Sequence, residues 1–108
     1  MPRYGCGWKR RRGRCRGKRW IEQIPETTYF RPNGLINSSD NTTVITFEEL
    51  EALRLVDLEN LTQEEAAIRM GISRKTLWND LQLARKKVIK ALVDGRAIHI
   101  EGGDYILR

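Results

Sequence analysis

Residues 62–84 constrain the fold of this chain more than any other segment, because they carry the spacing of a helix-turn-helix. Ala67 has too small a side chain to hold two crossing helices apart, and Gly71 can adopt the positive φ that a tight turn demands. Leu77 then anchors the second helix to the first. Because such a motif places its second helix in the major groove of DNA, DNA binding is the function that we expect.

Three capping signals mark where the helices begin. Thr46 with Glu49 and Thr62 with Glu65 have the spacing of capping boxes, in which each partner's side chain bonds the backbone of the other. Ser73 can cap the second helix of the motif. We therefore expect helices to start directly after each of these caps.

The segment 46–58 predicts a first helix. Phe47, Leu50, Leu53 and Asp57 share one face. The apolar surface is widened beyond that stripe by Ala52, Leu55, Val56 and Leu58. This pattern predicts a helix that is buried on two sides.

The helix that follows the turn is longer than a helix-turn-helix requires. An apolar stripe continues from residue 74 to about 93, and Gly95 stands just past its end, where a C-terminal cap is expected. The stripe consists of Leu77, Leu81, Ala84, Val88 and Leu92. The sequence therefore predicts one continuous helix of about five turns after a shorter helix over residues 62–70.

The C-terminal segment predicts two strands. Two alternating apolar runs within residues 97–107 flank Gly102 and Gly103, which is the pattern of a β-hairpin. A two-stranded hairpin alone is marginal in water, so its apolar face must rest on the helices or on a second subunit.

The fold that we expect is mainly α: a helix-turn-helix with a long third helix, a C-terminal β-hairpin and a basic, flexible N-terminal arm. A chain of 108 residues with 40% hydrophobic content suits one small domain and leaves little room for a large enclosed catalytic cleft. The expected divisions are an arm (1–20), an irregular or extended segment (21–45), the helix-turn-helix domain (46–95) and the hairpin (96–108).

Charge is distributed unevenly along the chain. Residues 1–20 hold nine of the 20 Lys and Arg residues and no acid, whereas the remaining 88 residues hold the other eleven against fourteen Asp and Glu. A basic arm on a slightly acidic body is typical of a protein whose arm contacts phosphates. The alternative is a solvated tail that keeps the protein in solution.

Targeting signals are not evident in the sequence. No apolar run approaches the ~20 residues that span a bilayer, and the arginine-rich N-terminus lacks the apolar region of a secretion signal. We expect no membrane association and a cytoplasmic location.

The start of the long helix carries the residue types that read base edges. Arg and Lys donate to guanine, Asn and Gln pair with adenine, and a helix N-terminus favours a nearby phosphate. The expected DNA-binding residues there are Ser73, Arg74, Lys75, Thr76, Trp78, Asn79 and Gln82. The alternative is an ordinary solvated face, in which Thr76 only completes the local cap.

Two further groups of cations are expected to hold the DNA backbone. Arg85 and Lys86 begin a basic band that continues to Lys90, although these charges could instead interact with the helix dipole. In the arm, the run Arg10, Arg11 and Arg12 could enter an adjacent minor groove or follow the phosphates. Each phosphate contact steepens the dependence of binding on salt.

Two residues of the long helix leave alternatives open. Trp78 is a large aromatic on a face expected to be exposed, which suggests a surface awaiting a partner, but it could also fold back onto the N-terminal segment. Asp80 is repelled by phosphate unless it accepts from a cytosine amine or pairs with a neighbouring cation.

Cysteine and histidine are too few for a zinc site within one chain. Cys6, Cys15 and His99 are the only thiol and imidazole ligands, whereas a closed site takes four. Two thiolates from each of two chains could share a metal, or the pair could be redox-active, but idle reduced cysteines are the simpler expectation. No catalytic triad, phosphate loop or carboxylate pair stands out, so we expect neither a cofactor nor enzymatic activity.

Several segments together resemble a widespread prokaryotic family of small proteins that are described as predicted DNA-binding. The similarity covers about residues 28–107 and includes FRPNG (30–34), EALRLVD (51–57), LTQEEAA (61–67), GISR (71–74), ARKK (84–87) and IEGGDY (100–105). The resemblance implies a helix-turn-helix similar to region four of bacterial sigma factors, in which the equivalent helix reads the promoter −35 element.

The chain departs from that family in two places. Family members often carry closely spaced cysteines near the N-terminus, whereas eight residues separate Cys6 from Cys15 here. Trp78 and Asn79 lie where the family varies, so the resemblance implies DNA binding without a shared target sequence.

The function that we expect is therefore sequence-specific DNA binding by a transcriptional regulator that reads double-stranded DNA with the helix starting at Arg74. One alternative is a sigma-like interaction module that docks on RNA polymerase or a partner regulator. Another is an RNA binder that uses the arginine-rich tail. Surplus apolar surface on the hairpin or at the end of the long helix suggests a homodimer.

Overall fold

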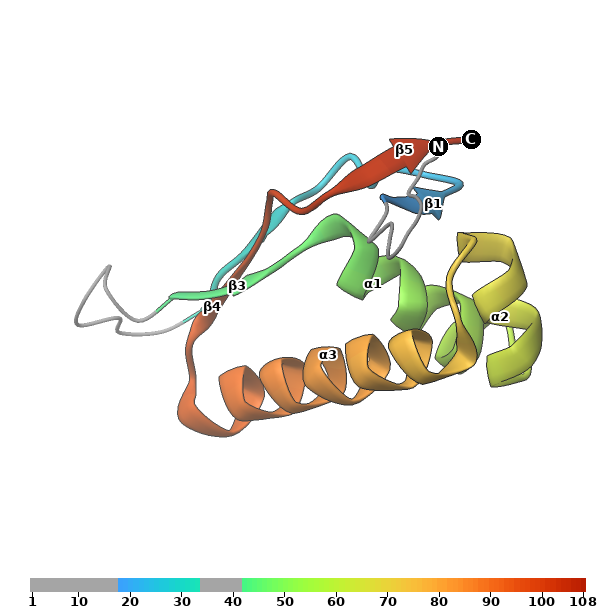
Figure 1. Cartoon of the computed structure of the whole chain (residues 1–108). Helices are drawn as coiled ribbons and strands as arrows, with labels where there is room; N and C mark the ends of the chain where they lie inside the picture. Colours follow the sequence, from blue (N-terminus) through green and yellow to red (C-terminus); the bar gives the residue numbers. More distant parts are fainter. Residues whose placement is uncertain (1–17, 34–41) are drawn as a thin grey trace.

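Helices and short strands form opposite sides of the molecule (Figure 1), whose computed structural model describes residues 18–33 and 42–108. In the figure, α3 runs along one side, α1 and α2 lie beside its N-terminal part, and the strands lie on the other side. The elements in chain order are β1 (Arg19–Ile21), β2 (Tyr29–Phe30), β3 (Thr42–Ile45), α1 (Phe47–Leu53), the π-helical turn η1 (Arg54–Leu58), α2 (Gln63–Met70), α3 (Arg74–Asp94), β4 (Ala97–Ile100) and β5 (Tyr105–Leu107).

The predicted caps begin all three α-helices. Thr46 and Thr62 both form complete capping boxes, and the Ser73 hydroxyl accepts the Thr76 N–H at 3.1 Å. Gly71 ends α2 and Gly95 ends α3, both with positive φ (68° and 69°). The structure thus contains the expected long third helix, which follows α2 after a tight turn at Gly71.

The core lies where the three helices cross. Ala67 and Leu77 are buried there, as their spacing predicts, together with Ala52, Leu55, Ala66, Met70 and Leu81. The predicted stripe on α3 was wrong at its end, because Leu92 is exposed and Ala91 is buried in its place. Fifteen residues do not complete a whole number of helical turns, so Leu92 points about 60° away from Leu77.

The two apolar sides of the first helix are buried to different extents. Phe47, Leu50 and Leu53 are only half-buried, while Ala52 and Leu55, on the other side of the helix, are fully buried. Small Ala52 lets α1 pack closely on its neighbours, and the larger residues are left at the surface.

No helix of the described ranges is both long and apolar enough to cross a membrane.

Both predicted C-terminal strands exist, but the predicted hairpin was wrong. β4 is the middle strand of a three-stranded sheet, parallel to β3 and antiparallel to β2, whereas β5 pairs in parallel with β1. The short strands therefore pair with segments that are distant in the chain and do not pair with each other.

The segment between these strands is bound to the start of α1. Phe47 donates its N–H to the Gly102 carbonyl (3.2 Å), and the Asp104 N–H donates to the Glu48 carboxylate (3.1 Å to Oε1). Gly103 has a φ of 106°, and a side chain at this position would overlap Glu48. These contacts carry the chain across the end of α1, which prevents a tight reversal between β4 and β5.

Candidate nucleic-acid interface

The hydroxyls at the start of α3 are occupied by the cap itself. Ser73 accepts the Thr76 N–H and also donates its hydroxyl hydrogen to Thr76 Oγ1 at 2.9 Å. These two bonds cap the N-terminus of α3.

The first turns of α3 present unpaired cations to solvent. Arg74, Lys75 and Asn79 are exposed, and Gln82 is half-buried beside them. Neither Arg74 nor Lys75 forms an ion pair with a carboxylate of residues 18–33 or 42–108. The residues that were expected to read bases therefore share an accessible surface whose cations are free to meet an anion.

Trp78 is part of this surface. It is 48% exposed, and the tryptophan of the N-terminal segment that packs on the motif is Trp20. The Trp20 ring covers the turn so closely that a Cβ on Gly71 would stand 2.9 Å from it. Trp20, and not Trp78, therefore covers the turn, and about half of the Trp78 side chain is available to a partner.

Asp80 is held by a cation of the N-terminal segment. The Arg19 guanidinium donates to both carboxylate oxygens, from Nε at 3.1 Å and from Nη2 at 3.2 Å, and both side chains are largely shielded from water. Of the alternatives for Asp80, the structure shows pairing with a cation. The negative charge of Asp80 is thus matched, and β1 is joined to α3 at this point.

The basic band on the second half of α3 is mostly neutralised. Arg85 binds Asp57 (2.7 and 3.1 Å) and holds the pKa of that carboxyl below its ordinary value. Lys87 binds the buried Glu49 at 2.9 Å, and Lys90 binds Asp94 at 2.9 Å. Lys86 forms no such ion pair within the described residues and is the member of this band that is free for phosphate.

Sequence reasoning missed an ionic network behind the motif. Arg54 donates to both oxygens of the buried Glu51 (2.9 Å each), and it also binds Glu22 (3.0 Å) and Glu59 (3.1 Å). Arg69 binds Glu22 as well, at 3.2 Å, so the network joins the N-terminal segment to α1, η1 and α2. The i, i+3 spacing of Glu51 and Arg54 could have revealed that pair, but no sequence signal pointed to Glu22.

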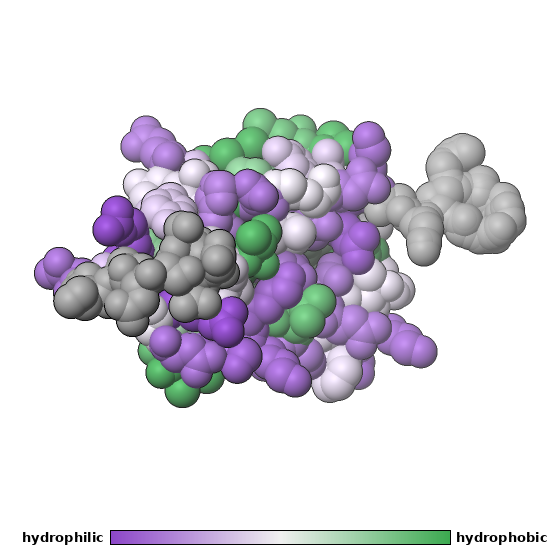
Figure 2. Space-filling model, turned by 90° about the vertical axis from the view of Figure 1, so that its left-hand side faces the viewer, coloured by the Kyte–Doolittle hydropathy of each residue, from purple (hydrophilic) through white to green (hydrophobic). Residues whose placement is uncertain are grey.

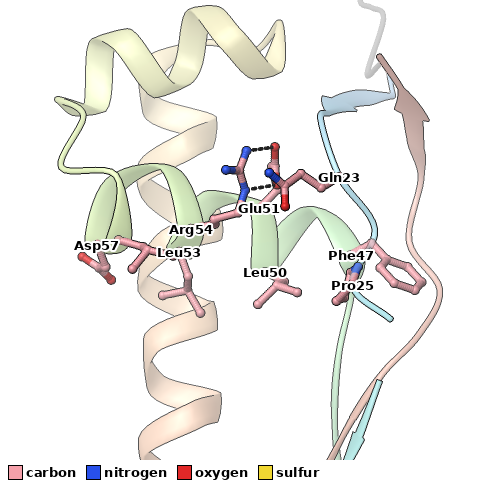
Figure 3. Close-up of a pocket in the computed structure, with 9 residues that line it drawn as sticks. Gln23, Pro25, Phe47, Leu50, Glu51, Leu53, Arg54 and Asp57 are labelled. Atoms are coloured by element: carbon pink, nitrogen blue, oxygen red, sulfur yellow. Dashed lines mark hydrogen bonds and ion pairs between the residues drawn. The ribbon is translucent and has the colours of Figure 1, made fainter. Parts of the chain in front are cut away.

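A groove of about 400 Å³ lies beside this network. Leu50 and Leu53 extend into it from one side of α1, with Pro25 and Phe47 at one end and Asp57 at the other (Figure 3). Its charged groups are already paired, since Arg54 is bound to Glu51 and Asp57 to Arg85. The groove offers an apolar wall and no unpaired charge to a ligand.

Comparison with known proteins assigns the chain to a family. A family described as "Protein of unknown function DUF134" matches residues 8–108, which is most of the chain. The chain belongs to the DUF134 family. Its similarity to an uncharacterised prokaryotic family was therefore predicted correctly from the sequence motifs.

Several DUF134 relatives carry the name UPF0251 protein. One from Methanosarcina acetivorans is 54% identical over 98 residues, covering 91% of this chain and 88% of its own length. One from Methanocella arvoryzae is 52% identical and covers 82% of this chain but 54% of its own length, so the chain spans about half of that relative. A bacterial one, from Caldanaerobacter subterraneus, is 48% identical over 81% of this chain. No solved structure matches the chain.

Some predicted site residues of this DUF134 member fall outside the described ranges. Arg10, Arg11, Arg12, Cys6 and Cys15 all precede residue 18. Among residues 18–33 and 42–108, no three His, Cys, Asp or Glu side chains are grouped so that they could hold a metal ion.

Proposed function

We propose that this protein is a sequence-specific DNA-binding regulator that inserts the N-terminal half of α3 into the major groove. The observation that carries the proposal is the free pair of cations, Arg74 and Lys75, next to exposed Asn79 on a capped helix of a helix-turn-helix. Matching of the Asp80 charge by Arg19 supports it, because an unmatched carboxylate would repel the phosphates.

The chemistry of these side chains suggests how bases would be read. Arg74 and Lys75 would donate to guanine O6 and N7, and Asn79 and Gln82 would pair with the N6 and N7 edge of adenine. The free cation Lys86, one residue past the paired Arg85, would bind a backbone phosphate.

The position of Arg19 gives the basic arm a role in the same proposal. Arg19, which follows the arginine-rich run in the sequence, is bound to Asp80 of the proposed reading helix. From there the run Arg10, Arg11 and Arg12 would contact phosphates or the adjacent minor groove. We include the sigma region-four-like binding mode and a cytoplasmic site of action in this proposal.

Selection of binding sites from a random duplex pool tests the proposal. We expect the full-length protein to enrich one motif, and Asn79→Ala to relax the preference at one base position at a cost of about 1–3 kcal/mol. Lys86→Ala should weaken binding to all sequences and reduce the salt slope by about one. Lys90→Ala is the matched control, because Lys90 is already bound to Asp94.

The absence of any enriched motif would contradict the proposal. If binding then persisted in Asn79→Ala and was lost in modest salt, the association would be electrostatic only. In that case, two alternatives would take its place. Either the arginine-rich tail binds RNA, or the exposed Trp78 docks on RNA polymerase.

A further inference from the structure

Trp78 is an apolar side chain in the middle of the candidate nucleic-acid interface. Arg74 precedes it and Gln82 follows it by four residues, so both are its neighbours on one face of α3. Lys75, three residues before it, is exposed as well. The indole is 48% exposed and therefore lies among the polar side chains to which the proposed function assigns the reading of bases.

Exposure alone does not assign a function to an apolar side chain. Figure 2 shows apolar groups scattered among hydrophilic side chains over the face that it draws, and single exposed apolar residues are normal on protein surfaces. Trp78 differs from such residues in its neighbours. Arg74 and Lys75 form no ion pair with a carboxylate of the described residues, so the surface around the indole suits a ligand that is rich in hydrogen-bond acceptors.

The exposed half of Trp78 has no stacking partner in the part of the chain that the structure describes. The aromatic and cation–π contacts within residues 18–33 and 42–108 join other side chains. Trp20, by contrast, lies against Gly71 and has the Arg108 guanidinium 4.0 Å from the centre of its ring. Trp20 is therefore used for packing, whereas Trp78 leaves a free apolar surface on α3.

The major groove offers the indole one apolar partner. The base edges there carry hydrogen-bond donors and acceptors, and the only methyl group among them is the 5-methyl of thymine. An apolar side chain that enters the groove without meeting this methyl group would remove water from polar base edges without compensation. Thymine is thus the base that complements the exposed half of Trp78.

We propose that Trp78 packs against the 5-methyl group of a thymine and so gives α3 a preference for that base. This inference rests on the proposed function, because that function places α3 in the major groove. Gln82 lies about one helical turn further along the same face and would bind the N6 and N7 edge of adenine. Since an A·T pair presents this edge together with the thymine methyl group, Trp78 and Gln82 favour A·T pairs in the same part of the site.

Replacement of single thymines by uracil in the preferred duplex tests the proposal, because uracil lacks only the methyl group. The duplex carries the motif that site selection enriches, and fluorescence anisotropy with the full chain measures the affinity. We expect one thymine whose replacement weakens binding about four-fold, which is the effect of one buried methyl group. Trp78→Ala should bind the thymine and uracil duplexes equally well.

Leu83→Ala is the matched control. Leu83 is 50% exposed on the same helix but points about 140° away from Trp78. This variant should keep the four-fold preference for thymine over uracil at the same position.

Two results would overturn the inference. One is a preferred duplex that has no thymine, or in which no replacement by uracil changes the affinity, as expected if Trp78 serves a protein partner instead. The other is a thymine preference that Trp78→Ala leaves unchanged while circular dichroism shows the variant folded. Failure to enrich any motif is a separate result, which would refute the proposed function and this inference with it.

Discussion

Gly71 and Gly95 have nearly the same backbone conformation but very different surroundings. Both cap a helix with a φ close to +68°, yet the Trp20 ring covers Gly71, while nothing lies within 4 Å of a Cβ built on Gly95. The requirement for glycine in the turn of the motif is therefore steric as well as conformational.

This difference predicts unequal effects of alanine at the two positions. Gly95→Ala should cost about 1–2 kcal/mol, which is the ordinary penalty for a side chain in the left-handed conformation. Gly71→Ala should cost about 1–3 kcal/mol more, because its methyl group must displace Trp20. Urea unfolding followed by circular dichroism measures both values.

The Trp20→Ala background checks the steric cause. In that background the two glycine variants should cost nearly the same, because the ring that distinguishes them is gone. An unchanged difference would mean that Trp20 does not limit the turn.

At the scale of elements, ion pairs join α3 to the segments that pack around it. Arg85 of α3 binds Asp57 of η1, Lys87 of α3 binds Glu49 of α1, and Arg19 of β1 binds Asp80 of α3. All three pairs cross between elements, so each specifies how α3 lies against its neighbours.

The Asp57 pair predicts a dependence of stability on pH. Arg85 lowers the pKa of Asp57 below the ordinary 3.8, so the pair stabilises the folded state above that value and the contribution is lost as the pH falls through the lower, folded-state pKa. At pH 7, Asp57→Asn should lower the free energy of unfolding by less than about 1 kcal/mol, since the pair is partly exposed. The difference from the unmodified protein should vanish in strong acid.

Thermal unfolding at several pH values measures this effect. Glu64→Gln is a suitable control, because Glu64 is exposed and has no ion pair within the described residues. A difference between Asp57→Asn and the unmodified protein that stays constant from neutral pH into strong acid would show that the Arg85 pair does not contribute to stability.

For the whole molecule, the division of charge is the dominant property. Residues 1–17 hold seven Lys and Arg and no acid, and the rest of the chain holds thirteen against fourteen Asp and Glu. The net charge of +6 therefore comes entirely from residues 1–17.

Deletion of residues 1–17 tests what this charge contributes under the proposed function. The slope of log affinity against log salt should fall by several units, because each phosphate that the arm no longer neutralises lowers it by about 0.9. The preferred sequence should persist, since α3 is intact. Fluorescence anisotropy on the enriched site and on a scrambled duplex, from low to physiological salt, separates these two effects. Loss of sequence preference on deletion would instead assign the reading of bases to the arm.

Local signals in the sequence predicted the helices well. The capping residues Thr46, Thr62 and Ser73 and the turn glycine Gly71 act over at most four residues, so their roles depend little on the rest of the chain. The burial of Ala67 and Leu77 follows from the same local spacing. The family membership was also evident from short motifs, whereas the DNA-reading role of α3 stays a prediction.

Features that depend on distant contacts could not be derived in this way. β4 and β5 show the same alternation whether they pair with each other or with β3 and β1, because a strand's pattern specifies its faces and not its neighbours. Likewise, nothing near Asp80 or Arg54 in the sequence identifies Arg19 or Glu22 as the cation and anion that meet them. By itself the sequence determined the helices and their ends, since these depend on local hydrogen bonds and periodicity. Only the tertiary structure decided the strand pairing, the exposed face of α1 and the ion pairs, because each requires residues far apart in the chain to meet.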